Sequence, residues 1–81
     1  MRVTIRLFAR LRELVGQAEV PGDLPEGATV REAWELLSRN FPAVSGYERS
    51  LSAAVNADYA RFTTRLHDGD EVAFLPPVSG G

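Results

Sequence analysis

The sequence contains no cysteine, and this absence excludes disulfide bonds, thiolate metal ligands and a cysteine nucleophile. It contains no lysine either, because all nine basic residues are arginine, so copies of the chain cannot be joined through a carboxyl end and a lysine side chain. Histidine occurs once, as His67. The sequence shows no nucleophile paired with a base, no metal-ligand cluster and no phosphate-binding loop, so we recognise no catalytic centre among its side chains.

Titratable side chains gather in one polar segment, residues 67–71. His67 stands beside Asp68, but adjacent residues on a turn rarely face a common pocket, so we interpret it as a surface histidine. Asp68, Asp70 and Glu71 lack the ligand spacing of a calcium-binding loop. We therefore predict a polar hairpin turn without a bound metal.

Long apolar runs are also missing, and the first residues alternate between apolar and polar instead of forming a signal peptide or a membrane span. We expect a cytoplasmic protein. A net charge of -2 provides no strong field for nucleic acid or an anionic membrane, so neither is expected as a partner. The local exception is Arg6, Arg10 and Arg12, which form either a solvated rim or an interface with an acidic partner or a phosphate.

The length of 81 residues is sufficient for one small domain. Such a domain buries only about 60% of the surface of its unfolded chain, so nearly every large apolar residue is needed in the core. We therefore expect little room for an internal ligand, and the function should use a surface or an end of the chain.

Apolar periodicity defines the first half of the domain. Period-two alternation predicts a strand over residues 3–8, and apolar residues at helical spacing predict a short helix over 9–15 that stops at Gly16. Residues 17–20 are predicted to return as a second strand. Turn chemistry is expected at 21–22 and 24–27.

The clearest helix begins at Thr29, which forms a capping-box pattern with Glu32, and ends before Pro42. Its apolar stripe includes Trp34, which we interpret as a core residue. After a loop through 45–46, strands are predicted over 53–56, 59–62 and 71–75, with turns at 56–58 and 68–70. This order predicts an α+β fold of the β-grasp type, with a mixed sheet packed on one main helix plus a short helix over residues 1–75.

The last six residues differ from the preceding strand, because two prolines lack backbone donors and two glycines lose the most entropy when they are ordered. We predict that residues 76–81 form an exposed, flexible tail. Glycines at the end would let the chain pass a narrow channel and leave the terminal carbonyl carbon open to attack. This pattern indicates a carrier arm, with the carboxylate of Gly81 as the reactant, activated with ATP by another protein and then attacked by a sulfur nucleophile.

Residues 68–81 resemble the carboxyl end of the small, sulfur-carrier subunits of molybdopterin synthases, within the ubiquitin-like β-grasp superfamily. Two further segments resemble the same family. Residues 7–16 resemble its first strand and short helix, and residues 24–30 resemble the start of its main helix. The resemblance implies a cytoplasmic heterotetramer with large catalytic subunits, and an adenylating enzyme related to ubiquitin activators. It also implies that Gly81 carries sulfur as a thiocarboxylate to cyclic pyranopterin monophosphate, and that the chain itself binds no cofactor, ATP being used by the activating enzyme. The partner-binding residues it implies are Gly80, Ser79, Val78, Pro77, Pro76, Phe74 and Arg10.

Two other interpretations remain open. A carrier with this ending could donate sulfur for thiazole synthesis or transfer-RNA thiolation, or could be conjugated to proteins as a modifier. Alternatively, the domain could be a non-catalytic β-grasp interaction module whose tail is only a disordered end.

Overall fold

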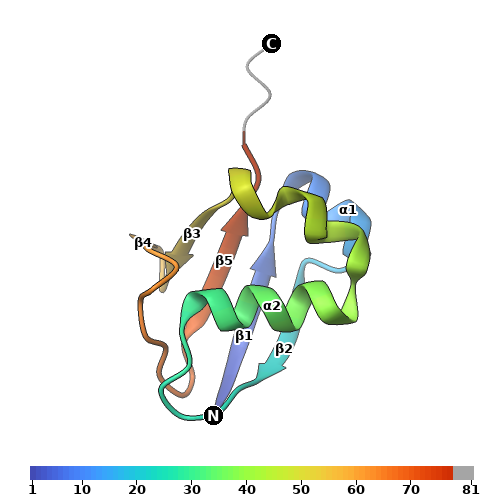
Figure 1. Ribbon diagram of the computed structural model, residues 1–81. Coiled ribbons are helices and arrows are strands. Elements are labelled where there is room, and N and C mark those ends of the chain that lie inside the picture. Colours follow the sequence, from blue (N-terminus) through green and yellow to red (C-terminus); the bar gives the residue numbers. More distant parts are fainter. Residues whose placement is uncertain (78–81) are drawn as a thin grey trace.

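One sheet and one long helix form the two main layers of the molecule, and the computed structural model describes residues 1–77 (Figure 1). Helix α2 lies across one face of the sheet, while the other face carries no helix among the described residues. The elements in chain order are β1 (Arg2–Leu7), α1 (Ala9–Val15), β2 (Glu19–Asp23), α2 (Val30–Asn40), the 3₁₀ helix η1 (Pro42–Ser50), β3 (Ser52–Val55), β4 (Asp58–Ala60) and β5 (Glu71–Leu75).

The five strands follow the spatial order β2-β1-β5-β3-β4. The first and last strands, β1 and β5, are parallel neighbours, whereas the other adjacent pairs are antiparallel. The last strand of the chain therefore occupies the centre of a mixed sheet. This arrangement confirms the predicted ubiquitin-like β-grasp architecture.

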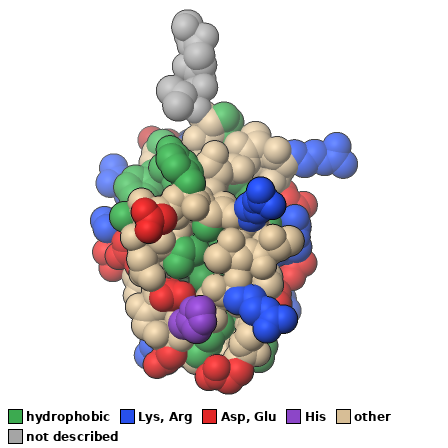
Figure 2. Space-filling model, turned by 90° about the vertical axis from the view of Figure 1, so that its left-hand side faces the viewer, with side chains coloured by type: hydrophobic (Ala, Val, Ile, Leu, Met, Phe, Trp, Pro, Cys, Tyr) green, Lys and Arg blue, Asp and Glu red, His purple; other side chains and the backbone are tan. Residues whose placement is uncertain are grey.

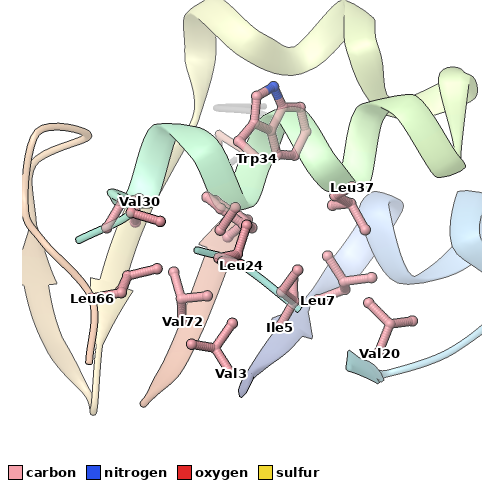
Figure 3. Close-up of a cluster of buried hydrophobic side chains, with 14 of the residues drawn as sticks. Val3, Ile5, Leu7, Val20, Leu24, Val30, Trp34, Leu37, Leu66 and Val72 are labelled. Atoms are coloured by element: carbon pink, nitrogen blue, oxygen red, sulfur yellow. The ribbon is translucent and has the colours of Figure 1, made fainter. Parts of the chain in front are cut away.

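The core fills the space between the sheet and α2 (Figure 3). Alternate residues of β1 and β5 point toward the helix, and the apolar stripe of α2 points back toward them, as its spacing predicted. Trp34 lies edge-to-face with Phe74, their ring centroids 5.1 Å apart, which confirms Trp34 as a core residue.

Helix α2 begins with the predicted capping box. The Thr29 hydroxyl accepts a hydrogen bond from the Glu32 N–H, and the Glu32 carboxylate accepts one from the Thr29 N–H at 3.2 Å. The helix ends at Asn40, two residues before Pro42. Over residues 1–77, no helix is both long and apolar enough to cross a membrane.

The prediction of a turn at Pro21 and Gly22 was wrong, because both residues belong to the edge strand β2. The Leu7 N–H donates to the Ala18 carbonyl and the Leu24 N–H donates to the Met1 carbonyl, so the even-numbered residues of β2 direct their backbone N–H and C=O groups toward β1. Pro21 is odd-numbered and its backbone groups point away from β1, so its missing N–H removes no hydrogen bond within the sheet. Strand interiors rarely contain these two residue types, which is why the pattern was misleading.

The segment between α2 and β3 was predicted as a loop, but it forms η1. Pro42 is its first residue, and the side chain of Val44, also in η1, is fully buried in the core. A 3₁₀ helix gives no clear 3.6-residue periodicity, so the apolar pattern did not indicate it.

Candidate functional site

The end of β5 is the structural base of the predicted carrier tail. The strand runs through the centre of the sheet, and beyond Leu75 the described chain has no regular structure. Pro76 is half-buried and Pro77 is exposed. The predicted roles of Val78, Ser79, Gly80 and Gly81 lie outside the described residues.

Phe74 does not have the surface position that a partner-binding residue needs. Its side chain is 0% exposed, lies between Trp34 and Phe62, and stacks on the Phe62 ring at 6.4 Å. The assignment of Phe74 to a partner surface is therefore corrected: β5 turns this residue toward α2, and its role in the described chain is to fill the core.

Arg10 lies on α1 with its side chain 58% exposed, and one guanidinium nitrogen is 3.4 Å from a carboxylate oxygen of Glu13. Its predicted partner role stays a prediction. Arg6 reaches both Glu19, at 3.7 Å, and Glu71, at 3.6 Å. Carboxylates thus accompany two members of the cluster formed by Arg6, Arg10 and Arg12, which leaves it with little local positive charge.

The face of the sheet opposite α2 carries an apolar surface that the sequence analysis missed. Tyr59 is 86% exposed and Phe8 is 39% exposed, which makes them the exposed large hydrophobic side chains of residues 1–77. They line a shallow pocket together with residues of β3 and β5, with Ala57 of the turn after β3, and with the ion-paired Arg6 of β1. We call Phe8 and the apolar strand residues of this surface the open-face patch, which consists of Phe8, Ala54, Tyr59, Ala73 and Leu75.

The open-face patch reaches the end of β5, because Leu75 is the last residue of that strand. A signal for it was present in the sequence: residues 71–75 are apolar at 73 and 75 as well as at 72 and 74, so one apolar set had to face away from the core. Exposed apolar surface of this kind is typical of sites that bind another protein.

The polar segment 67–71 forms the predicted turn, and His67 is exposed on it. Asp70 accepts hydrogen bonds from the Asn56 side chain at 2.9 Å and from the His67 N–H at 2.8 Å. These bonds, with that from Asn56 the stronger influence, lower the pKa of Asp70. Asn56 also accepts a bond from the Glu71 N–H at 3.0 Å, so this network fixes the β3–β4 hairpin against the start of β5. No group of three metal-ligating side chains occurs within residues 1–77.

Comparisons with known proteins extend over nearly the whole chain. The molybdopterin synthase sulfur carrier subunit of Escherichia coli is 41% identical over 81 residues, which cover 98% of this chain and 99% of that protein. The subunit of the same name from Chlamydomonas reinhardtii is 34% identical, with both chains fully covered. The crystal structure of SAMP1 from Haloferax volcanii superposes with a TM-score of 0.90 at 31% identity, and also covers both chains completely. The model of the ThiS family matches residues 5–81, and the chain therefore belongs to the ThiS family.

Proposed function

We propose that this chain is the sulfur carrier subunit of a molybdopterin synthase and that it works through the carboxyl group of Gly81. The observation that carries the proposal is the end-to-end similarity to the Escherichia coli carrier subunit, at 41% identity. The fold supports it, because a central strand leads directly into the last residues of the chain.

The chemistry begins with a carboxylate, which is a poor electrophile. In the proposed cycle, an adenylating enzyme related to ubiquitin activators joins the Gly81 carboxylate to the α-phosphate of ATP and releases pyrophosphate. Hydrosulfide, supplied by a sulfur donor, then attacks the carbonyl carbon; the new C–S bond replaces the bond to AMP, AMP leaves, and the product is a thiocarboxylate. ATP is used by that enzyme, so this chain needs no cofactor of its own.

The carrier must then deliver its sulfur to a catalytic partner. We propose that this partner is the large subunit of molybdopterin synthase, in a heterotetramer, and that the pterin substrate is cyclic pyranopterin monophosphate. The open-face patch is the surface best suited to binding the partner, since it combines exposed apolar side chains with a position beside the last residue of β5. Binding there would hold the base of the tail against the partner.

The test is the intact mass of the protein after incubation with ATP, the adenylating enzyme and a sulfur donor. We expect a gain equal to the replacement of one oxygen by sulfur, located at Gly81 by fragmentation. A variant that lacks Gly80 and Gly81 should show no gain and should keep the stability of the wild type. If a demonstrably competent enzyme produces no gain in the wild type, the carrier proposal is wrong and the interaction module is favoured.

A matched pair of glycine variants tests the steric role of the tail. Gly80→Val should slow sulfur transfer, because a branched side chain hinders passage through a narrow channel. Gly46→Val is the control, since a Cβ at Gly46 meets nothing within 4 Å. Equal transfer rates for the two variants would remove the steric argument.

A second candidate function is protein modification, favoured by the similarity to SAMP1 of Haloferax volcanii, a small archaeal modifier protein. The same adenylated glycine would then react with a lysine amine of a target protein. The test is mass spectrometry of cell extracts for a peptide that ends in Gly80-Gly81 attached to a lysine. Finding the thiocarboxylate and no such peptide would favour the carrier alone.

A further inference from the structure

Three arginines from two distant segments of the sequence lie around the first turn of α2. The segment that follows β4 runs beside this turn: Val30 donates its N–H to the Thr64 carbonyl at 2.9 Å, and Arg31 donates its own to Phe62 at 3.0 Å. An isolated bridge pairs Thr29 with Arg65. We call Arg31, Arg61 and Arg65 the arginine corner.

The arginine corner is exposed, and no nearby carboxylate of the described chain neutralises its positive charge. All three side chains are exposed, and none lies within ion-pair distance of a carboxylate in residues 1–77. Arg2, Arg6 and Arg10 each have such a carboxylate partner. The concentration of free positive charge at one place is unexpected in a chain whose net charge is -2.

This placement does not serve helix stability. The first turn of a helix carries partial positive charge and favours acidic side chains, and like charges close together repel. Glu32 is the acidic residue of this turn, and it is already engaged in the capping box. A local arrangement that opposes stability is expected at a functional site.

The backbone of the corner is firmly held. The Leu66 N–H donates to the Ala28 carbonyl at 2.8 Å, which adds a third bond between the two segments. The Arg31 guanidinium lies 5.3 Å from the centroid of the Phe62 ring, and that ring stacks on Phe74 in the core. A fixed backbone reduces the entropy lost when a partner binds.

One member of the corner follows closely in the chain on the surface already described. Arg61 directly follows β4, whose central residue is Tyr59 of the open-face patch. Figure 2 looks onto the β4 side of the molecule and shows hydrophobic side chains at the upper left, with arginine side chains on the right-hand half and at the left edge and acidic side chains among them. An apolar surface with a charged margin is the usual composition of a protein interface.

We propose that the arginine corner binds an acidic surface of the large subunit that receives the sulfur, and thereby accelerates its encounter with the carrier. Guanidinium groups match carboxylates in paired hydrogen bonds. Nucleic acid is a poorer occupant, because the corner supplies only three charges and the whole chain is acidic. The inference rests on the proposed function, since that function identifies the large subunit.

The experiment compares two triple variants that change the net charge equally. The corner variant is Arg31→Gln, Arg61→Gln and Arg65→Gln. The control variant is Arg2→Gln, Arg39→Gln and Arg49→Gln, which alters exposed arginines outside both the arginine corner and the cluster formed by Arg6, Arg10 and Arg12. The association rate constant is measured with the large subunit of molybdopterin synthase from the same organism, over a range of salt concentrations. We expect about a tenfold decrease at low salt for the corner variant, a weaker salt dependence, and little change for the control.

Folding is checked by thermal unfolding, where the corner variant should stay close to the wild type, because relief of the repulsion offsets loss of the Arg31 contact with the Phe62 ring. Equal association rates for the two variants would overturn the inference, as would a wild type whose rate does not depend on salt. Transfer RNA serves as a second probe: if the corner variant loses affinity for transfer RNA but associates normally with the large subunit, an acidic protein is the wrong occupant. The carrier chemistry is tested separately by the mass gain of the wild type. A wild type that gains this mass but does not bind the large subunit would overturn the inference and the assignment to molybdopterin synthase, and would leave the carrier chemistry standing.

Discussion

Ala57 has a backbone conformation that alanine rarely adopts. Its φ is 74°, and that of Asn56 is 51°, so both residues of the two-residue turn between β3 and β4 are left-handed. A left-handed alanine is strained because its Cβ crowds the following carbonyl, and glycine avoids this contact. Ala57→Gly relieves this strain in the folded state but also increases the conformational entropy of the unfolded chain, which offsets part of the gain. The net effect should be a rise in the free energy of unfolding of about 0.5–1 kcal/mol.

Chemical denaturation measures this difference, and Ala43→Gly provides the control. Ala43 is also exposed, but its φ is not positive, so the same substitution should lower the free energy of unfolding. If both substitutions destabilise the protein equally, the turn is not strained.

Asp70 should make stability depend on pH in the acidic range. Its pKa is below the ordinary 3.8, chiefly because of the hydrogen bond from Asn56. A carboxyl whose pKa is depressed in the folded state stabilises the fold above its unfolded pKa, and this contribution is lost as the pH falls through the folded value. Asn56→Gly keeps the left-handed turn but removes the bond, so the pKa of Asp70 should rise toward 3.8. The acid-induced loss of stability due to Asp70 should then be smaller and should be complete at a higher pH.

Carboxyl titration by NMR follows Asp70 directly. Asp23 is the internal reference, because its pKa is lowered chiefly by the hydrogen bond from Arg2 and should be the same in both proteins. An unchanged titration of Asp70 in Asn56→Gly would show that Asn56 is not the main cause.

Single elements differ in how well the sequence predicted them. The strand now seen at Arg2–Leu7, the helix at Ala9–Val15 and the long helix all follow from apolar spacing, because each packs one face against the core. The edge strand Glu19–Asp23 was placed too early, since nothing in the sequence reveals that Pro21 lies on the outward side of an edge. The pairing of β2 with β1 determines on which side the backbone nitrogen of Pro21 lies.

The candidate site was predictable to the extent that it depends on residue type. The two terminal glycines and the prolines before them stand out in the sequence, and the family similarity extends to residue 81. The open-face patch escaped prediction because its members come from different strands and meet only through the sheet order. Phe74 was assigned to the partner surface from the family resemblance. Alternation did not correct this assignment, because both faces of β5 are apolar and the pattern alone does not say which set is buried.

The central strand β5 has one face buried against α2 and one face on the open-face patch. The contributions of these two faces to stability and to partner binding can be measured separately. Val72 and Phe74 face α2, whereas Ala73 and Leu75 belong to the open-face patch with Tyr59. Phe74→Ala should lower the free energy of unfolding by about 3–5 kcal/mol, which is a large part of the 5–15 kcal/mol typical of a domain. Any loss of partner binding in that variant would come from unfolding.

Tyr59→Ala should have the opposite profile. The side chain is 86% exposed, so its removal should change the free energy of unfolding by no more than about 0.5 kcal/mol. Its loss from the interface should weaken binding to the large subunit by about 1–2 kcal/mol, or roughly tenfold, because aromatic side chains contribute strongly to protein interfaces. Calorimetric titration and denaturation of the same samples measure both quantities. The milder variant Phe74→Leu keeps most of the core volume, so the folded variant should bind the large subunit normally. The opposite result would be a folded Phe74→Leu that fails to bind beside a Tyr59→Ala that binds normally. That result would place the partner contact at Phe74 and remove it from the open-face patch.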